Sequence, residues 1–294
     1  MELSRLVSEL DNYFRVDDVR GDSWESFFSE AYGVAPWREC FESRYQQTWN
    51  GLMVRGQETV AEVVTCVFPT ATIIDSLAPG TLLFTEHPIE LVDELFTVPD
   101  LARLDRLKRA CAGIYQVHAP LDHHPEVSPS RLLARALRLT DTEEYFPVAE
   151  GIPGGALVIG NTSASLADLL SRLRTTLGLE VPVDLHSQWR EAAGRVAIAA
   201  GGGAQTEMLA ASVEKGCQTY ITGNALSACA LLAVRRELDA FAALAARMKV
   251  SVIDATHYGS EKLSQLEMLN WFAAAGVSAR FATGLPERRG RRHV

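Results

Sequence analysis

Hydrophobic and polar positions follow helical and strand periods in different parts of the chain. Near the N-terminus, apolar residues recur three or four positions apart, at Leu3, Leu6, Val7, Leu10 and Phe14. This spacing predicts an amphipathic helix. Residues 20–48 mix aromatic and charged side chains, and we expect this region to be helical and partly docked.

From residue 59 onward, short apolar runs rich in β-branched and aromatic residues indicate buried strands. The predicted strands cover residues 60–68, 81–84, 114–117, 196–200, 219–222, 250–254 and 279–282. Helical spacing between them predicts helices at residues 99–112, 165–178, 207–215, 225–236, 241–248 and 260–275. This alternation predicts an α/β fold with largely parallel or mixed sheets covered by helices.

Three parts are predicted along the chain. Residues 1–48 form an N-terminal helical extension, residues 49–148 a first α/β lobe, and residues 149–294 a second α/β lobe. The boundary follows from residues 150–155, where glycine and proline favour a hinge.

Five side chains that can ligate a metal occur in three stretches: Glu86 with His87, Asp122, and His257 with Glu261. Each stretch follows a predicted strand, so a sheet can gather them at its carboxyl edge. Carboxylate oxygens mixed with imidazole nitrogens suit a divalent cation such as Zn, Mn, Fe, Ni or Mg. Five protein ligands exceed what one open catalytic ion uses, so we expect two ions that share a carboxylate.

The pair Glu86 and His87 has two interpretations. Pro88 cannot donate to a strand ladder and keeps His87 extended, so the strand should end here and both side chains can turn toward one cavity. The alternative is a pair of residues on an exposed loop.

The pair His257 and Glu261 depends on where its helix begins. If Thr256 caps the helix, the two side chains share one face, as ligands of one ion do. Gly259 can equally delay the helix to Ser260, which would separate them.

Histidines cluster around Asp122, at His118, His123 and His124. Three histidines and an aspartate within seven positions make a metal site plausible at this loop. For His123 and His124 the alternative is a loop residue that packs against proline or faces solvent.

Glycines at positions 201–203 follow one predicted strand and precede a helix. The run lacks both the G-x-G-x-x-G spacing and the Walker lysine. We favour a tight turn or a close approach of backbone, and a contact to a substrate phosphate or carboxylate is the alternative.

Composition narrows the function classes. A chain of 294 residues with 47% hydrophobic and 22% charged residues can bury a sizeable core in about two domains. The formal net charge of −9 argues against a broad nucleic-acid-binding face. Residues 288–292 are strongly basic, and we interpret them as a solvated terminus.

Cysteine spacing and hydropathy predict a cytoplasmic protein that does not bind membranes. The five cysteines form no C-x-x-C pair, so neither a disulfide framework nor a zinc knuckle is expected. The charged N-terminus lacks the apolar region of a signal peptide. The apolar residues 225–234 reach about half the length of a membrane span, so we expect a core helix there.

Six stretches in order resemble the Nif-three-like family, relatives of NGG-one-interacting factor three that are often labelled GTP cyclohydrolase I type 2. They are residues 49–52, 82–89, 114–122, 196–203, 220–223 and 254–261. The resemblance implies two intertwined α/β lobes with mixed sheets, a dinuclear metal centre between them, and a toroidal homohexamer.

Ligand roles follow from the same resemblance. It implies that His87, Asp122 and Glu261 hold one ion, and that Glu86, His257 and Glu261 hold the other, so that Glu261 bridges. His118 matches a family histidine beside the centre and would either support the metal ligands from behind or carry protons.

The chain departs from the family pattern at two places. Glu86-His87 replaces a His-His pair, and Thr48-Trp49-Asn50 replaces Trp-Asp-Asn. A carboxylate at Glu86 hardens the site and favours Mn, Mg or Fe. The N-terminal 48 residues are also longer than the family leads us to expect.

The expected function is that of a metal-dependent hydrolase acting on a small molecule. The cyclohydrolase label would make the substrate a nucleotide. The alternatives are a non-catalytic metal-binding or scaffold ring, and a nucleotide-sensing regulator that uses the glycine turn.

Overall fold

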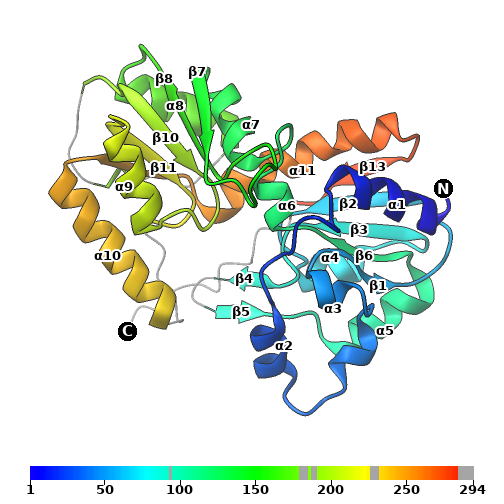
Figure 1. The fold of residues 1–294 in the computed structure, drawn as a ribbon. Helices are drawn as coiled ribbons and strands as arrows, with labels where there is room; N and C mark the ends of the chain where they lie inside the picture. Colours follow the sequence, from blue (N-terminus) through cyan, green and yellow to red (C-terminus); the bar gives the residue numbers. More distant parts are fainter. Residues whose placement is uncertain (93–94, 179–184, 187–190, 226–231, 284–294) are drawn as a thin grey trace. The chain divides into compact units, whose positions relative to one another are not determined.

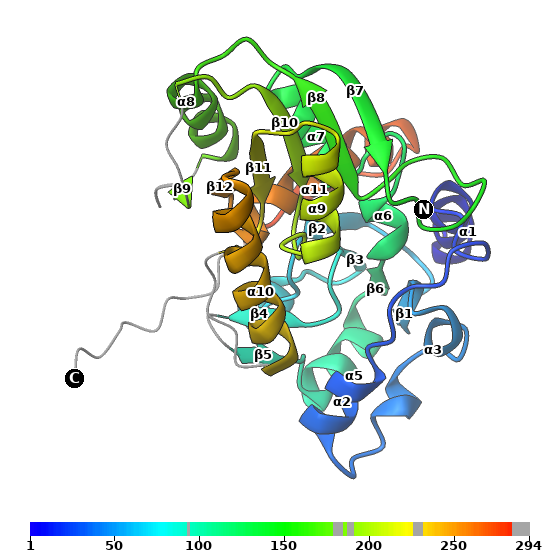
Figure 2. The same ribbon diagram turned by 60° about the vertical axis from the view of Figure 1, so that its left-hand side comes forward.

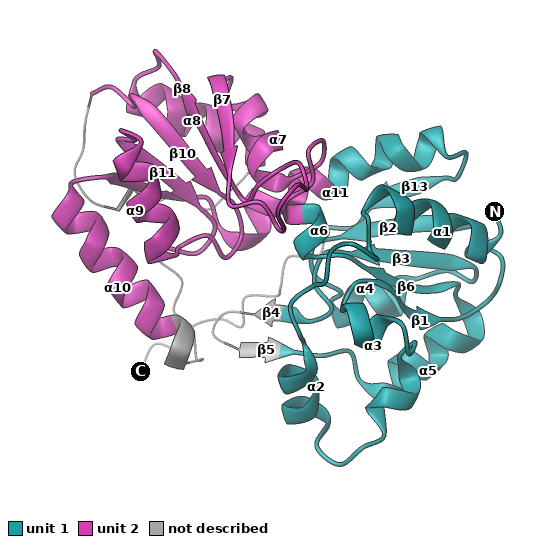
Figure 3. Ribbon diagram, in the orientation of Figure 1, with its two compact units in different colours: residues 1–121, 265–294 teal, residues 122–264 magenta. Residues whose placement is uncertain are grey.

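The computed structural model describes residues 1–92, 95–178, 185–186, 191–225 and 232–283. The chain forms two compact units (Figure 3). Unit 1 comprises Met1–Leu121 and Gln265–Val294, and unit 2 comprises Asp122–Ser264. Unit 1 is therefore built from two separate parts of the sequence, with unit 2 inserted between them.

Unit 1 contains a mixed five-stranded sheet in the order β1-β6-β3-β2-β13. The strands are β1 (Gly51–Arg55), β6 (Gly113–Gln116), β3 (Thr81–Thr85), β2 (Glu62–Cys66) and β13 (Ala279–Phe281). β1 runs antiparallel to β6, and the other neighbours are parallel. A separate two-stranded sheet joins β4 (Glu90–Val92) to β5 (Leu95–Thr97).

Helices cover both faces of the unit 1 sheet (Figure 1). They are α1 (Leu3–Tyr13), α2 (Glu25–Tyr32), η1 (Trp37–Cys40), α3 (Tyr45–Thr48), α4 (Ala71–Ser76), α5 (Leu101–Ala110) and the second half of α11 (His257–Ala274). Phe84 of β3 stacks on Phe14, which follows α1, and meets Phe272 of α11 edge-on. Helices α2 to α5 contribute to a core cluster on the strands that also holds Ile114 and Val64.

The N-terminal 48 residues are part of unit 1 and not a separate extension. The predicted helix α1 is confirmed, and all of its predicted apolar positions are buried. Backbone hydrogen bonds anchor the start of this helix to the chain before β2. The N–H of Leu3 donates to the carbonyl of Glu58 at 2.8 Å, and the N–H of Val60 donates to the carbonyl of Met1 at 2.8 Å. Phe28 and Trp37 belong to the same core cluster as the strands.

Unit 2 contains a mixed six-stranded sheet in the order β7-β8-β10-β11-β12-β9. The strands are β7 (Thr140–Tyr145), β8 (Leu157–Asn161), β10 (Arg195–Ala199), β11 (Thr219–Thr222), β12 (Ser251–Asp254) and β9 (Leu185–His186). The three central strands β10, β11 and β12 are parallel, and the outer pairings are antiparallel.

The unit 2 sheet has helices on both faces. They are α7 (Pro129–Ala136) and α8 (Leu166–Leu177) on one face, and α9 (Thr206–Glu214) and α10 (Leu232–Met248) on the other. Figure 2 shows α9 and α10 in front of the strands. The short helix α6 (Ala119–Asp122) carries the chain into this unit. The predicted cap of α8 is confirmed, because Ser165 accepts from the N–H of Asp168 and Gly178 ends the helix in the left-handed region.

Two features of the predicted lobes differ from the units. Residues 150–155 lie between β7 and β8 of one sheet and are no hinge between units; a Cβ on Gly154 would lie 1.7 Å from the His123 carbonyl. The strand predicted at residues 279–282 belongs to unit 1, because β13 pairs with β2. Sequence periodicity reports which residues are in strands, and it carries no information on which strand is the partner.

Helix α10 also corrects a prediction. The sequence predicts two helices, at 225–236 and 241–248, with a break between them, but α10 continues without interruption to Met248. No glycine or proline at residues 237–240 ends the helix there. Residues 226–231 of the predicted core helix, and the basic residues 288–292, lie outside the described residues. Among the described helices, none is long and apolar enough to cross a membrane.

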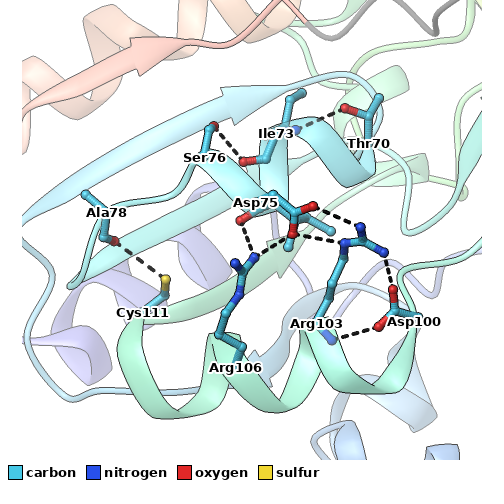
Figure 4. Close-up of polar contacts among 10 residues, drawn as sticks. Thr70, Ile73, Asp75, Ser76, Ala78, Asp100, Arg103, Arg106 and Cys111 are labelled. Carbon is cyan, nitrogen blue, oxygen red and sulfur yellow. Dashed lines mark hydrogen bonds and ion pairs between the residues drawn. The ribbon is translucent and has the colours of Figure 1, made fainter.

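An ion-pair network joins α4 to α5 at the surface of unit 1 (Figure 4). Arg103 contacts both carboxylate oxygens of Asp75 at 3.0 and 2.9 Å, and Arg106 contacts one of them at 2.7 Å. Hydrogen bonding from Arg103 lowers the pKa of the Asp75 carboxyl. The contribution to stability is therefore complete above the usual aspartate pKa of about 3.9, and it is lost as the pH falls through the lowered value.

We expect Asp75→Asn to lower the free energy of unfolding by about 0.5–1 kcal/mol at pH 7, a small effect because the side chain of Asp75 is 44% exposed. Urea unfolding at pH 7 and at pH 3 should show a smaller difference from the parent at the lower pH. Asp105→Asn, which removes a single exposed pair on α5, is the control. An equal loss for both variants at pH 7 would contradict the network.

Candidate metal centre

The candidate ligands Glu86 and His87 are buried beyond the carboxyl end of β3 in unit 1. The N–H of His87 donates to the carbonyl of Val67 at 3.1 Å, which extends the pairing of β3 with the chain after β2. The Thr85 hydroxyl lies 2.9 Å from the carbonyl of His87. Exposed fractions of 0% for Glu86 and 2% for His87 show that the exposed-loop interpretation is wrong.

Two buried amides position Glu86. The Gln265 side-chain N–H lies 3.4 Å from Oε2 of Glu86, and the Gln116 side chain donates to the Glu86 carbonyl at 2.7 Å. Both glutamines have no exposed surface. Gln116 thus fixes the backbone of Glu86, and Gln265 restricts the orientation of the carboxylate, as the outer partner of a metal ligand does.

Aromatic rings enclose His87. Phe68 stacks on it with ring centroids 4.8 Å apart, and His118 lies at the same distance in a tilted arrangement. Trp24 approaches edge-on at 6.1 Å. The predicted ligand His87 and the predicted proton carrier His118 are therefore neighbours within unit 1.

His118 is held from two sides. Its backbone N–H donates to Oδ1 of Asn50 at 3.0 Å, and its Nδ1 lies 3.5 Å from a carboxylate oxygen of Asp22. The Trp24 ring meets it edge-on at 5.3 Å. Asn50, which matches the last residue of the family's Trp-Asp-Asn, thus supports His118 through its side-chain oxygen.

In unit 2, the predicted pair His257 and Glu261 is brought together on the first turn of α11. The helix begins at His257, because the Thr256 hydroxyl accepts from the N–H of Gly259 at 3.0 Å. Asp254 at the end of β12 accepts from the N–H of Thr256 at 2.8 Å. His257 Nε2 consequently lies 2.9 Å from Oε1 of Glu261.

Asp122 completes the ligands of unit 2. It is half-buried at the end of α6, and one of its carboxylate oxygens lies within 4.8 Å of a Glu261 oxygen. Glu261 also lies within that distance of a His257 nitrogen. Only 2% of Glu261 is exposed. This buried carboxylate is therefore next to both other candidate ligands of its unit.

The glycine run makes room for Glu261. Gly201 has a φ of +57°, and a Cβ on it would lie 1.9 Å from Oε1 of Glu261. The N–H of Gly201 donates to the Ser260 hydroxyl at 2.9 Å. A Cβ on Gly223 would lie 2.5 Å from the Gly201 carbonyl. The close-approach interpretation of this run is confirmed.

His124, in the loop after Asp122, stabilises the backbone of that loop. Nδ1 of His124, which is 8% exposed, accepts from the N–H groups of Glu126 and Val127 at 3.1 and 3.4 Å. Neither His123 nor His124 belongs to a candidate ligand group among the described residues. For His124 the loop interpretation holds, although the side chain is buried and not exposed.

Sequence reasoning missed Gln265, Asp22 and Trp24. Gln265 could have been found from its spacing, because it follows Glu261 by one helical turn and lies on the same helix face. Nothing in the local pattern at Asp22 and Trp24 connects them to residues about 65 and 95 positions later along the chain.

The donor set fits a divalent cation. Three carboxylates and two imidazoles are the mixed oxygen and nitrogen ligands that such ions take. Burial of the carboxylates Glu86 and Glu261 costs free energy unless each charge is paired or coordinates a metal. Because Gly201 leaves space beside Glu261 that a side chain would fill, the local backbone is compatible with a ligand there.

Comparison with known proteins gives one family. The family model described as Duf34/NIF3 (NGG1p interacting factor 3) matches residues 37–281. A Deinococcus radiodurans protein named "GTP cyclohydrolase 1 type 2 homolog" is 28% identical over 178 residues, which are 60% of this chain and 66% of that protein. The Escherichia coli (strain K12) protein of the same name is 29% identical over 180 residues, 60% of this chain and 69% of its own length.

A solved structure supports the fold. The structure titled "protein ybgI, unknown function" superimposes with a TM-score of 0.67 and covers 96% of this chain and 98% of its own. Its sequence identity is 20%. At that identity the likeness concerns the fold, and the mixed α/β architecture of the two units agrees with it.

Proposed function

The chain belongs to the Duf34/NIF3 family, and we propose that it is a divalent-metal-binding protein whose dinuclear centre hydrolyses a small molecule. The observation that carries the proposal is the position of Glu261. Within unit 2 this buried carboxylate lies next to both Asp122 and His257. A carboxylate has two oxygens, so it can ligate two ions at once.

Two ligand sets support a pair of ions. As the family resemblance implies, one consists of His87, Asp122 and Glu261, and the other of Glu86, His257 and Glu261. Since Glu86 and His87 belong to unit 1, the proposed centre takes ligands from both units.

Helix α11 supports the joint centre because it runs through the boundary between the units. Glu261 and Gln265 lie one turn apart on one helix face. Gln265 contacts Glu86 in unit 1 at 3.4 Å. The helix backbone therefore links the proposed bridging carboxylate to the residue that orients Glu86.

Bound ions would polarise a carbonyl or phosphoryl oxygen of the substrate and lower the pKa of a water toward neutrality. The protein's own groups would manage the protons. We assign proton transfer to Nε2 of His118, because Nδ1 faces Asp22 and an imidazole can both accept and donate a proton. The rings of Trp24 and Phe68 would limit water around His87.

The names of the relatives support a nucleotide as the substrate. A non-catalytic metal-binding ring is the second candidate, and the specific observation in its favour is Glu86 in place of the usual family histidine. The nucleotide-sensing alternative relied on the glycine turn. Because Gly201 makes room for Glu261, that alternative loses its main support.

Metal content tests the proposal. After loading with Mn²⁺ or Zn²⁺ and gel filtration, the protein should retain about two ions per chain by elemental analysis. A ratio near one would mean a mononuclear site, and a ratio near zero would remove the metal hypothesis. Screening the loaded protein against nucleotides, phosphoesters and cyclic amides then separates a hydrolase from a ring that holds metal without turnover.

Family membership also supports a closed homo-oligomer, which we propose to be a toroidal hexamer. Light scattering should give a mass of six subunits, and a monomer at micromolar concentration would contradict this. The free thiols of Cys40, Cys66, Cys111 and Cys217 support a reducing compartment such as the cytoplasm.

A further inference from the structure

We propose that Trp24 is a substrate-binding residue, and that its indole N–H donates a hydrogen bond to an anionic oxygen of a phosphoryl group. This inference rests on the proposed metal-dependent function and names the ligand chemistry of the same site. Trp24 and the two histidines beside it belong to unit 1.

The first observation is a buried donor beside the candidate centre. Trp24 is 8% exposed, and its indole nitrogen has no hydrogen-bond partner among the described residues. An indole N–H can only donate, so it needs an acceptor from elsewhere. Burial of a donor without a partner costs free energy that binding of an acceptor would offset.

The second observation is the place of that indole. Its ring lies edge-on to both His118, at 5.3 Å, and His87, at 6.1 Å between centroids. One of these histidines is a proposed metal ligand and the other is the proposed proton carrier. The indole ring therefore lies beside the two groups to which the proposal assigns the chemistry.

The backbone around Trp24 is fixed in this position. The N–H of Gly21 donates to the carbonyl of Thr48 at 2.7 Å, and a Cβ on Gly21 would lie 2.4 Å from the side-chain nitrogen of Asn50. Trp24 also starts α2, where its carbonyl accepts from Phe28 at 3.1 Å. The indole is therefore held in place before a ligand arrives, which lowers the entropy cost of binding.

Trp24 comes from a segment that the family match does not cover, because the matched residues begin at 37.

The charge of the metal-loaded centre indicates which kind of acceptor would bind the Trp24 N–H. The three proposed carboxylate ligands carry three negative charges, and two divalent ions carry four positive charges. The loaded centre would therefore have a net charge of +1 and would attract anions. Asp22 does not compete for the indole, because its carboxylate faces Nδ1 of His118. A phosphoryl oxygen combines negative charge with acceptor capacity, which matches both the centre and the indole.

The test uses inorganic phosphate as the probe and the full-length, Mn²⁺-loaded protein. Trp24→Phe keeps an aromatic ring but removes the N–H. Calorimetric titration should show phosphate binding by the parent and about tenfold or greater weakening in the variant, the loss expected for one hydrogen bond to a charged group. Trp37→Phe is the matched control, since Trp37 is 4% exposed and packs on Phe28 without contact to the histidines.

An NMR measurement on the Mg²⁺-loaded protein adds a readout independent of turnover. The indole ¹H–¹⁵N signal that is missing in Trp24→Phe should move when phosphate is added to the parent, and the Trp37 signal should stay. Absence of phosphate binding by the parent, or equal affinity in parent and Trp24→Phe, would overturn the inference. Metal content is measured separately and tests the proposed function. If the protein retains metal but binds phosphate equally well without the Trp24 indole, only the inference about Trp24 is rejected.

Discussion

Glu261→Gln should release both metal ions from the protein. The substitution keeps the size and hydrogen-bonding capacity of the side chain but removes the negative charge that two cations would share. Even partners of metal ligands change affinity by about 10- to 100-fold when they are replaced. We therefore expect more than a hundredfold weaker binding of each ion, measured by elemental analysis after gel filtration and by competition with a chelator.

Single-ion variants make the comparison sharper. Under the proposed pairing, Glu86→Ala weakens mainly one ion and Asp122→Asn mainly the other, so each single variant should retain about one ion per chain. The double variant should lose both ions, and a double variant that keeps one ion would contradict this pairing. Retention of two tightly held ions by Glu261→Gln would show that the carboxylate does not bridge and that its contact with His257 belongs to the helix surface.

Gly201→Ala should disrupt the centre without replacing any ligand. Its Cβ would lie 1.9 Å from Oε1 of Glu261 and 3.4 Å from Nε2 of His257, so the glutamate or the turn must move. The φ of +57° adds strain for any residue with a Cβ. We expect a loss of about 1–3 kcal/mol in unfolding free energy and greatly weakened metal binding.

Gly202→Ala provides the matched control one residue away. A Cβ at this position would meet nothing within 4 Å. Its stability, measured by urea unfolding, and its metal content should stay close to those of the parent. Equal behaviour of the two alanine variants would mean that the turn adapts freely, and that the close approach to Glu261 has no role in positioning it.

Local chemistry explains which parts of the fold could be predicted from sequence. The cap at Ser165 and the glycine at 178 act on residues within the same helix, so α8 was predicted at nearly its observed bounds. The strand at Thr219–Thr222 was predicted exactly as found for a similar reason, since its apolar run is bounded by turn residues on both sides.

Non-local pairing explains what could not be predicted. β7, with sequence Thr-Asp-Thr-Glu-Glu-Tyr, is largely exposed and lacks the apolar pattern of a buried strand. It forms because β8 offers an edge to pair with. The assignment of β13 to unit 1 likewise depends on β2, more than 200 residues earlier.

The candidate ligands could be predicted because each follows a strand, and strand ends are recognisable locally. Their surroundings could not. Burial of Glu86, its contact with Gln265 and the edge-on approach of Trp24 to His87 all join segments far apart in the sequence.

The order of segments along the chain has a consequence for synthesis on the ribosome. All residues of unit 2 have been synthesised once residue 264 is added, whereas the unit 1 sheet still lacks β13 at that point. Until residues 279–281 emerge, β2 lacks its outer neighbour and presents open N–H and C=O groups, which can pair with other chains. The segment made first is therefore the one that finishes folding last, and a nascent chain halted near residue 264 would carry a finished unit 2 beside an aggregation-prone strand.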